Sequence, residues 1–194
     1  MHVTEQICKE LSDLEIVQKS LQDVEYFACL YNKYEPKLLR YIKRISYSSR
    51  EESEDILQEA FIKIWRNLND FDQSLKLSSW IYRIVHNETV SFWRKKTSYG
   101  KSQTLELPED ISSLEDNTFG EENELSDNTA KINKTLQKLP LKYREILVLK
   151  FLEMMSYEEI SDVLKIPEGT VATRINRAKK AFIQQGGKEN FSWS

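Results

Sequence analysis

The hydrophobic residues of the N-terminal half recur every three or four positions, the spacing of one face of an α-helix. The longest stripes are Phe27, Leu30, Tyr31, Tyr34, Leu38, Tyr41 and Ile45, followed by Ile56, Ala60, Phe61, Ile64, Trp65 and Leu68. A shorter pattern of the same kind begins at residue 11, and another includes Trp80. No stretch alternates strictly between apolar and polar positions, so the pattern predicts helices and no β-sheet.

Two pairs of polar residues mark helix starts. Ser49 and Glu52 stand three positions apart before the second stripe, and Ser156 and Glu159 repeat this arrangement near the C-terminus. Ser followed by Glu at this distance forms a capping box, in which each side chain accepts a hydrogen bond from the other residue's backbone N–H. We therefore predict that helices begin at these two serines.

Single residues indicate further helix boundaries. Ser78 or Ser79 is expected to cap the helix that contains Trp80, and Thr170 is expected to cap the last helix. Pro36 falls inside the first stripe, where its ring should bend the helix or begin a new turn.

Residues 156–182, SYEEISDVLKIPEGTVATRINRAKKAF, form two short amphipathic segments around a turn that contains Pro and Gly, which is a helix-turn-helix pattern. Its apolar side consists of Ile160, Leu164, Ile166, Val171, Ile175, Ala178 and Phe182. The other side of the second segment carries Thr173, Arg174, Asn176, Arg177 and Lys180. These side chains suit base edges and phosphates in a DNA major groove, and the alternative is an ordinary solvated basic face.

Charge is distributed in blocks along the chain. The 194 residues carry a net charge of −3, yet residues 25–98 hold a net +3 and residues 131–188 a net +6. Residues 99–130 hold one Lys against nine Asp and Glu, together with Pro, Gly, Ser and Asn. Such a composition buries too little apolar surface to fold alone. We therefore predict an acidic flexible linker at 99–130 between helical domains at 12–98 and 131–187.

Several functional classes have no supporting motif. The first ten residues show no basic n-region and no apolar h-region, and no apolar run approaches the length of a membrane span, so neither secretion nor membrane spanning is expected. Cys8 and Cys29 form no CxxC pair and are expected to be two buried or partly buried thiols in a reducing cytoplasm. Neither His2 nor His86 has metal-ligand spacing, and His86 is expected to be structural or close to DNA. The chain has no Gly-rich phosphate loop and no paired catalytic carboxylates, so no enzyme, cofactor or metal site is predicted.

Motifs in both blocks resemble one family. The C-terminal block contains L-P-x-x-x-R, then S-Y-E-E-I, then G-T-V-x-x-R-x-x-R-A, and the N-terminal block contains EDILQEAFIKIWRNL and SSWIYRIVHN. The C-terminal motifs resemble region 4, and the N-terminal motifs region 2, of the extracytoplasmic-function sigma factors of bacterial RNA polymerase. Region 2, the linker and region 4 follow one another over roughly residues 20–185. The resemblance implies an all-α protein of two helical domains that directs core polymerase to promoters.

The resemblance also implies roles for individual residues. Core polymerase would be bound by Asp55, Gln58 and Glu59, which match positions that grip a coiled coil of the β′ subunit. The −10 element would be read and melted by Phe71, Arg83, Asn87, Arg94, Lys95 and Lys96. Among these, Phe71 and Asn87 would shape a pocket for an extruded base, whereas Trp80 is expected in the core. The −35 element would be contacted by Ser156, Tyr157, Thr170, Thr173, Arg174, Asn176, Arg177 and Lys180.

The implied partners are the β′ and β subunits of the polymerase core, promoter DNA and an anti-sigma factor, all met in the cytoplasm. The linker would then be either a solubilising spacer or a strand that enters the polymerase RNA path. The departures from the family pattern are Ser91, where many relatives have Asp, Met154, where Gly is usual, and Ala172 and Asn176, where longer side chains are common. A dimeric helix-turn-helix repressor or activator and a protein–protein adaptor are the alternative functions.

Overall fold

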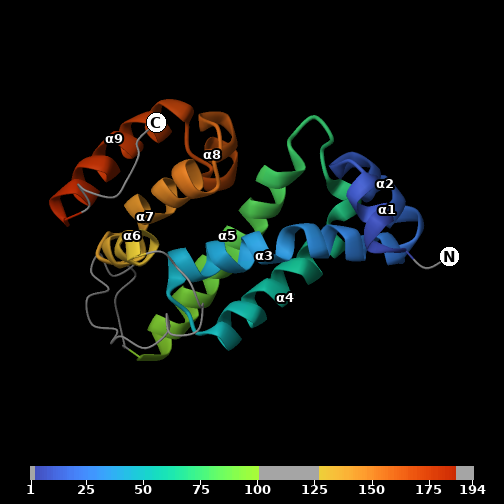
Figure 1. Ribbon diagram of the computed structural model, residues 1–194, viewed down its shortest axis with the longest axis horizontal. Coiled ribbons are helices and arrows are strands. Elements are labelled where there is room, and N and C mark those ends of the chain that lie inside the picture. The colour runs from blue at the N-terminus through green and yellow to red at the C-terminus, as the bar shows by residue number, and fades with distance from the viewer. Residues whose placement is uncertain (1–2, 101–126, 187–194) are drawn as a thin grey trace.

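The structure is a computed structural model that describes residues 3–100 and 127–186, and all regular structure in these ranges is helical (Figure 1). The N-terminal part contains α1 (Glu5–Glu10), α2 (Asp13–Gln22), η1 (Val24–Tyr26), α3 (Phe27–Ser46), α4 (Arg50–Arg66), η2 (Leu68–Asp70) and α5 (Leu77–Gly100). The C-terminal part contains α6 (Asp127–Gln137), α7 (Leu141–Leu147), η3 (Val148–Leu152), α8 (Tyr157–Leu164) and α9 (Glu168–Gln184). The predicted all-α class is confirmed.

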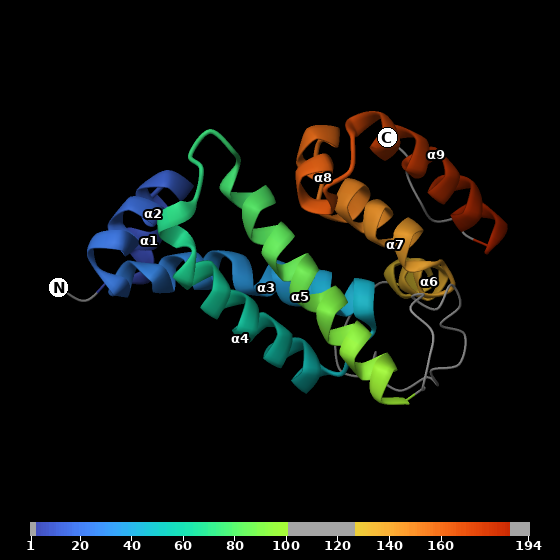
Figure 2. The ribbon, with the colours of Figure 1, turned by 180° about the vertical axis from the view of Figure 1, so that it is seen from behind.

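The N-terminal core forms where α3, α4 and α5 pack side by side, with α2 against α3 (Figures 1 and 2). Leu38 and Ile42 of α3, Ile64 of α4 and Ile81 of α5 are completely buried there. The hydrophobic stripes therefore face the core as predicted. Trp65 is an exception, because 40% of its surface is exposed.

Both capping boxes form where the sequence predicts them. Ser49 Oγ accepts a hydrogen bond from the Glu52 N–H at 3.2 Å, and the Ser49 N–H donates to Glu52 Oε2 at 3.0 Å. Ser156 and Glu159 make the same pair of bonds at 3.2 and 2.7 Å. Each box satisfies two backbone donors that a helix start leaves without intrahelical partners.

The start of α5 differs from the prediction. The helix begins at Leu77, so Ser78 and Ser79 lie inside its first turn and neither caps it. The Trp80 N–H already donates to the Lys76 carbonyl at 3.2 Å, because helical hydrogen bonding starts upstream of both serines.

Two prolines bear on the predicted helix boundaries. Pro167 precedes α9 and its fixed φ favours a helix start, so Glu168 begins the helix and Thr170 lies in the first turn instead of capping it. The Thr170 N–H donates to the Pro167 carbonyl at 2.8 Å. Pro36 lies inside α3, which runs unbroken from Phe27 to Ser46 and starts no new helix there.

The C-terminal helices pack onto the N-terminal part, with α7 against α3 and α8 against α5 (Figures 1 and 2). Lys76, just before α5, lies 3.2 Å from a carboxylate oxygen of Glu159 on α8, and Tyr82 of α5 donates a hydrogen bond to Glu153 after η3. Within the C-terminal part, Ile160, Val171 and Phe182 form a shared core with α7.

The predicted linker at 99–130 lies mostly outside the described residues. Helix α5 continues to Gly100 and α6 begins at Asp127, so both helices extend into the predicted range, and residues 101–126 are not described. Within residues 3–100 and 127–186, no helix is both long enough and apolar enough to span a membrane.

The prediction of two separate thiols is wrong. Cys8 of α1 and Cys29 of α3 form a disulfide across 21 residues of sequence. Their spacing in the sequence gives no sign of this pairing, because it depends on α1 folding back against the start of α3.

Candidate polymerase- and DNA-binding surfaces

A groove of about 770 Å³ runs between α3 and α4. Its apolar lining comes from Val24, Phe27, Tyr31, Phe61, Ile62 and Trp65, and its polar lining from Glu35, Glu54, Asp55 and Gln58. Val24, Ile62 and Trp65 expose large apolar side chains there. An apolar groove with an acidic rim fits a partner helix that presents both apolar and basic side chains.

The three predicted polymerase contacts all lie on the outer side of α4. Asp55, Gln58 and Glu59 are exposed, whereas the neighbouring Ile56 and Ala60 are buried. Asp55 and Gln58 line the groove, and Glu59 is not part of its lining. None of the three side chains contributes to the hydrophobic core, so a partner could contact them without unfolding α4.

The predicted −10 residues fall into a buried and an accessible group. Phe71 is only 6% exposed and its ring lies 5.3 Å from that of Trp80, which is buried as predicted. Arg83 is half-buried, whereas Asn87 is exposed on the same helix. Phe71 and Asn87 therefore do not form an open base pocket in this structure. The remaining predicted residues, Arg94, Lys95 and Lys96, are exposed towards the end of α5.

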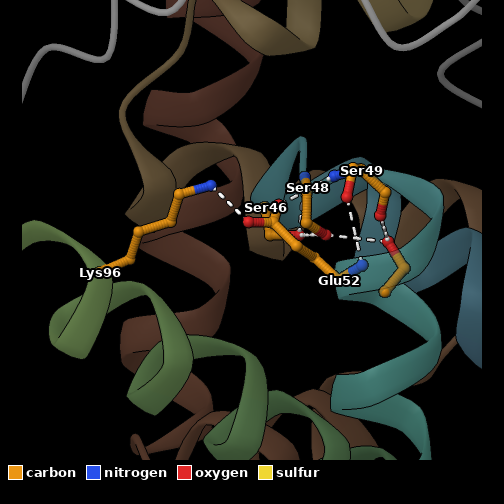
Figure 3. A network of polar contacts seen from close by, with 6 residues as sticks. Ser46, Ser48, Ser49, Glu52 and Lys96 are labelled. Atoms are coloured by element: carbon orange, nitrogen blue, oxygen red, sulfur yellow. Dashed lines mark hydrogen bonds and ion pairs between the residues drawn. The ribbon is translucent and has the colours of Figure 1, made fainter.

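A serine network lies at the α3–α4 turn beside Glu52, whose capping bonds are to Ser49 (Figure 3). Ser46 Oγ and Ser48 Oγ are 2.8 Å apart, Ser48 Oγ and Ser53 Oγ are 2.9 Å apart, and all three residues are buried. At the edge of this network, Lys96 donates to Glu52 Oε1 at 2.6 Å (Figure 3). Lys96 would have to exchange this carboxylate for a phosphate in order to bind DNA.

The predicted −35 residues lie on α8 and α9, with Ser156 at the N-cap of α8, and they differ in their exposure to solvent. Those that are exposed are Ser156, Tyr157, Thr170, Thr173, Asn176, Arg177 and Lys180. The inward residues Val171, Ile175, Ala178 and Phe182 are buried as predicted. Arg174 differs from its neighbours, because it is half-buried and its Nη1 lies 3.3 Å from Glu145 Oε1 on α7.

Glu145 is the centre of a buried polar cluster between the two parts of the protein. Its Oε2 lies 3.7 Å from Nε2 of His86 on α5, and Nδ1 of His86 is 2.9 Å from the Tyr41 hydroxyl on α3. Burial raises the pKa of Glu145 to about 7, against the opposing effects of Arg174 and Arg144. Burial lowers the pKa of His86 to about 4, so this histidine is neutral and structural at neutral pH.

Arg144 anchors α7 on the N-terminal part. Its side chain is completely buried, donates to the Ile45 carbonyl of α3 at 3.1 Å and lies over the Tyr47 ring at 4.6 Å. A second bond to the Leu139 carbonyl measures 3.3 Å. No role for Arg144 was predicted from its residue type, although it ends the L-P-x-x-x-R motif, which was the available signal.

Two family matches correspond to the two helical parts. Residues 30–99 match the family described as Sigma-70 region 2, and residues 129–182 match Sigma-70, region 4. The ECF RNA polymerase sigma factor SigW of Bacillus subtilis is 34% identical over 178 residues, which cover 88% of this chain and 94% of that protein. The chain belongs to the extracytoplasmic-function sigma factors. The order of region 2 before region 4 agrees with the resemblance described above.

Other similar proteins include further sigma factors. The RNA polymerase sigma-H factor of Pseudomonas aeruginosa is 34% identical over 175 residues, covering 87% of this sigma factor and 89% of that protein. Two solved structures share the fold at low sequence identity. CnrH in complex with the cytosolic domain of CnrY gives a TM-score of 0.64 at 20% identity, covering 90% of this chain and 96% of the other. The sigma factor RpoE of Bartonella quintana, in complex with the anti-sigma factor NepR, gives 0.62 at 21% identity, covering 84% and 98%.

Proposed function

We propose that this sigma factor directs core RNA polymerase to specific promoters and initiates transcription there. The single observation that carries this function is the pair of matches to sigma regions 2 and 4, in family order and on two separate helical parts. The proposal involves binding and strand opening driven by binding energy, with no covalent step assigned to the protein. The partners are core polymerase and promoter DNA, and the protein would act in the cytoplasm, where bacterial polymerase is found.

Core polymerase would bind along the groove between α3 and α4. The exposed apolar side chains of Ile62 and Trp65 offer a surface for a helix of the β′ coiled coil. Asp55, Gln58 and Glu59 would add hydrogen bonds and charge at the outer side of α4, where all three are accessible. Burial of apolar area would supply most of the affinity and the acidic rim the orientation.

The −10 element would be melted and read by α5 and the segment before it. Asn87, Arg94 and Lys95 are accessible for this role, with the two basic side chains suited to the DNA backbone. A base pocket at Phe71 requires this ring to leave Trp80, so we propose that the pocket opens only when polymerase and DNA bind.

The −35 element would be read by α9 in the major groove. Asn176 and Arg177 can hydrogen-bond base edges from the exposed side of this helix, and Lys180 can bind a phosphate. Ser156, Tyr157 and Thr170 lie at the starts of α8 and α9, where contacts with the DNA backbone are expected.

Binding both promoter elements would require the two parts of the protein to separate. Here α8 is packed against α5, the helix that carries most of the proposed −10 residues. Arg174, a proposed −35 contact, is meanwhile paired with Glu145 of α7, whose carboxylate also faces His86 of α5. We therefore propose that the packed arrangement binds promoter DNA poorly and that core polymerase stabilises an open one.

A titration of core polymerase with fluorescently labelled protein tests the polymerase-binding surface. The double variant Gln58→Ala with Glu59→Ala should lose core binding while its thermal melt stays unchanged, because both side chains are exposed. Gln18→Ala with Gln22→Ala is the control, since it removes two exposed polar side chains from α2 and should bind normally. Normal core binding by the Gln58/Glu59 variant would contradict the surface assigned here.

A further inference from the structure

The N-terminal arm, residues 3–11, makes only weak contacts with the rest of the protein, except for its disulfide. It contains α1, whose six residues include none that is buried and whose N-cap side chain makes no hydrogen bond. The polar contacts of α1 are internal, with Lys9 at 2.8 Å from Glu5 and Gln6 at 3.3 Å from Glu10. A helix of this length is unstable in water on its own. Only Val3, Cys8 and Leu11 pack partly against the core, so the covalent bond to Cys29 is the main attachment.

Cys29 joins this arm to the edge of the α3–α4 groove. It is the third residue of α3, is 1% exposed, and lies in sequence between Phe27 and Tyr31, which both line the groove. The N-cap residue of α3, Tyr26, makes no side-chain capping bond. The first turn of a helix frays readily, so a covalent bond at Cys29 restrains the turn that carries Phe27.

The rest of the N-terminal part does not depend on the arm. Helix α2 begins with its own capping box, Ser12 with Glu15. Asp13 then ties α2 to α3, because it lies 2.8 Å from Lys33 and accepts a hydrogen bond from Tyr34 at 2.8 Å. Breaking the disulfide therefore releases residues 3–11 and leaves α2 on α3, which is a local change with low free-energy cost.

We propose that Cys8–Cys29 is a thiol–disulfide exchange site that controls the order of the arm and of the first turn of α3. The part of this proposal that concerns polymerase rests on the proposed function. Polymerase operates in a reducing compartment, where disulfides are usually transient, catalytic or redox-sensing. The oxidised protein binds core polymerase more tightly, because the restrained turn holds Phe27 in the groove.

The exchange is a balanced reaction with a small thiol. A thiolate attacks Sγ of half-buried Cys8, forming a mixed disulfide and expelling Cys29 as a thiolate, which takes up a proton. A second thiol then attacks the mixed disulfide, which leaves Cys8 as a free thiol and releases the small-molecule disulfide. Two thiols are thereby oxidised as the protein disulfide is reduced, and a small-molecule disulfide drives the reverse reaction.

The test compares the full chain after oxidised glutathione and after dithiothreitol, using hydrogen exchange measured by mass spectrometry and core polymerase titration. Reduction should abolish exchange protection in residues 3–11, speed exchange in residues 24–31 and weaken core binding several-fold, with α5 unchanged. Cys8→Ser, which leaves buried Cys29 in place, should behave as the reduced protein under both treatments.

Each readout has its own contrary result. Free thiols after oxidised glutathione, or residues 3–11 equally protected in both states, would overturn the exchange site. Unchanged exchange in residues 24–31 together with equal core affinity would overturn the coupling to the groove. Absence of core binding in both states would instead contradict the proposed function. The exchange data would still test whether the disulfide controls the order of the arm and of the first turn of α3.

Discussion

Arg174 on α9 ion-pairs with the buried carboxylate of Glu145 on α7, with 3.3 Å between Nη1 and Oε1. The same carboxylate approaches His86 of α5, so one acidic residue connects the proposed DNA-reading helix to the N-terminal part. A guanidinium held in this way is withheld from phosphates. Rearrangement around Glu145 therefore accompanies the opening proposed above.

The packing of the two parts should loosen as pH rises. The pKa of Glu145 is raised to about 7 in the folded state by burial, so its stabilising contribution is complete below pH 4.5 and is lost as pH rises through 7. The effect is on the order of 3 kcal/mol, since each pKa unit is worth about 1.4 kcal/mol. The charged and titratable groups that act on Glu145 are Arg174, Arg144, His86 and Tyr41, and the low pKa of His86 keeps it neutral over this range.

Small-angle X-ray scattering between pH 5.5 and pH 8 measures this loosening. The radius of gyration should increase with pH in the wild type and stay constant in Glu145→Gln, which retains an acceptor for Arg174 but does not titrate. Identical pH profiles for both proteins would show that Glu145 does not control the packing.

Replacing Met154 with Gly should stabilise the protein. Met154 has φ of 57°, in the left-handed region, and its side chain is 77% exposed, so little packing would be lost. Relief of about 1–2 kcal/mol of strain is opposed by about 0.5–1 kcal/mol of backbone entropy. We expect a net gain of up to about 1.5 kcal/mol in the free energy of unfolding, measured with urea. Met154→Ala keeps the strain and serves as the control, and an equal gain in that variant would refute the backbone explanation.

Local features of the fold were predictable because residues close in sequence determine them. Ser49 with Glu52 and Ser156 with Glu159 begin helices as predicted, and Val171 and Ile175 face inward because helical spacing alone sets their direction. The failures at Ser78, Ser79 and Thr170 are also local. At these positions the upstream backbone had already begun the helix, so a good capping residue was not used.

Contacts between distant segments were not predictable from one sequence. The bond from Arg144 to the Ile45 carbonyl joins residues 99 positions apart, and the Cys8–Cys29 pairing requires the arm to fold back. The burial of Phe71 against Trp80 likewise depends on how the segment before α5 packs. Of the candidate surfaces, the exposure of Asp55 and Arg177 followed from helical periodicity, whereas the pairing of Arg174 with Glu145 did not.

Arg177→Ala should impair promoter recognition without destabilising the protein. Arg177 is exposed on α9, and a base-reading arginine contributes about 1–3 kcal/mol of discrimination. Transcription of a library of −35 mutants by the reconstituted holoenzyme should show relaxed preference at one position, with an unchanged thermal melt. Lys138→Ala, which removes an exposed positive charge from outside α9, should keep the wild-type preference. If Arg177 contacts only phosphate, binding weakens equally for all promoter sequences. The slope of log affinity against log salt concentration then falls by about one.

Transcription in vitro from a library of bacterial genomic fragments tests the central claim most directly. Core polymerase alone should give no defined start sites, and added protein should produce transcripts from a discrete set of promoters that share −10 and −35 sequences. The Gln58→Ala, Glu59→Ala double variant should fail to do so. The account would be contradicted if the protein produced no promoter-specific transcripts with active core polymerase, above all if the free protein instead bound a duplex operator tightly as a dimer.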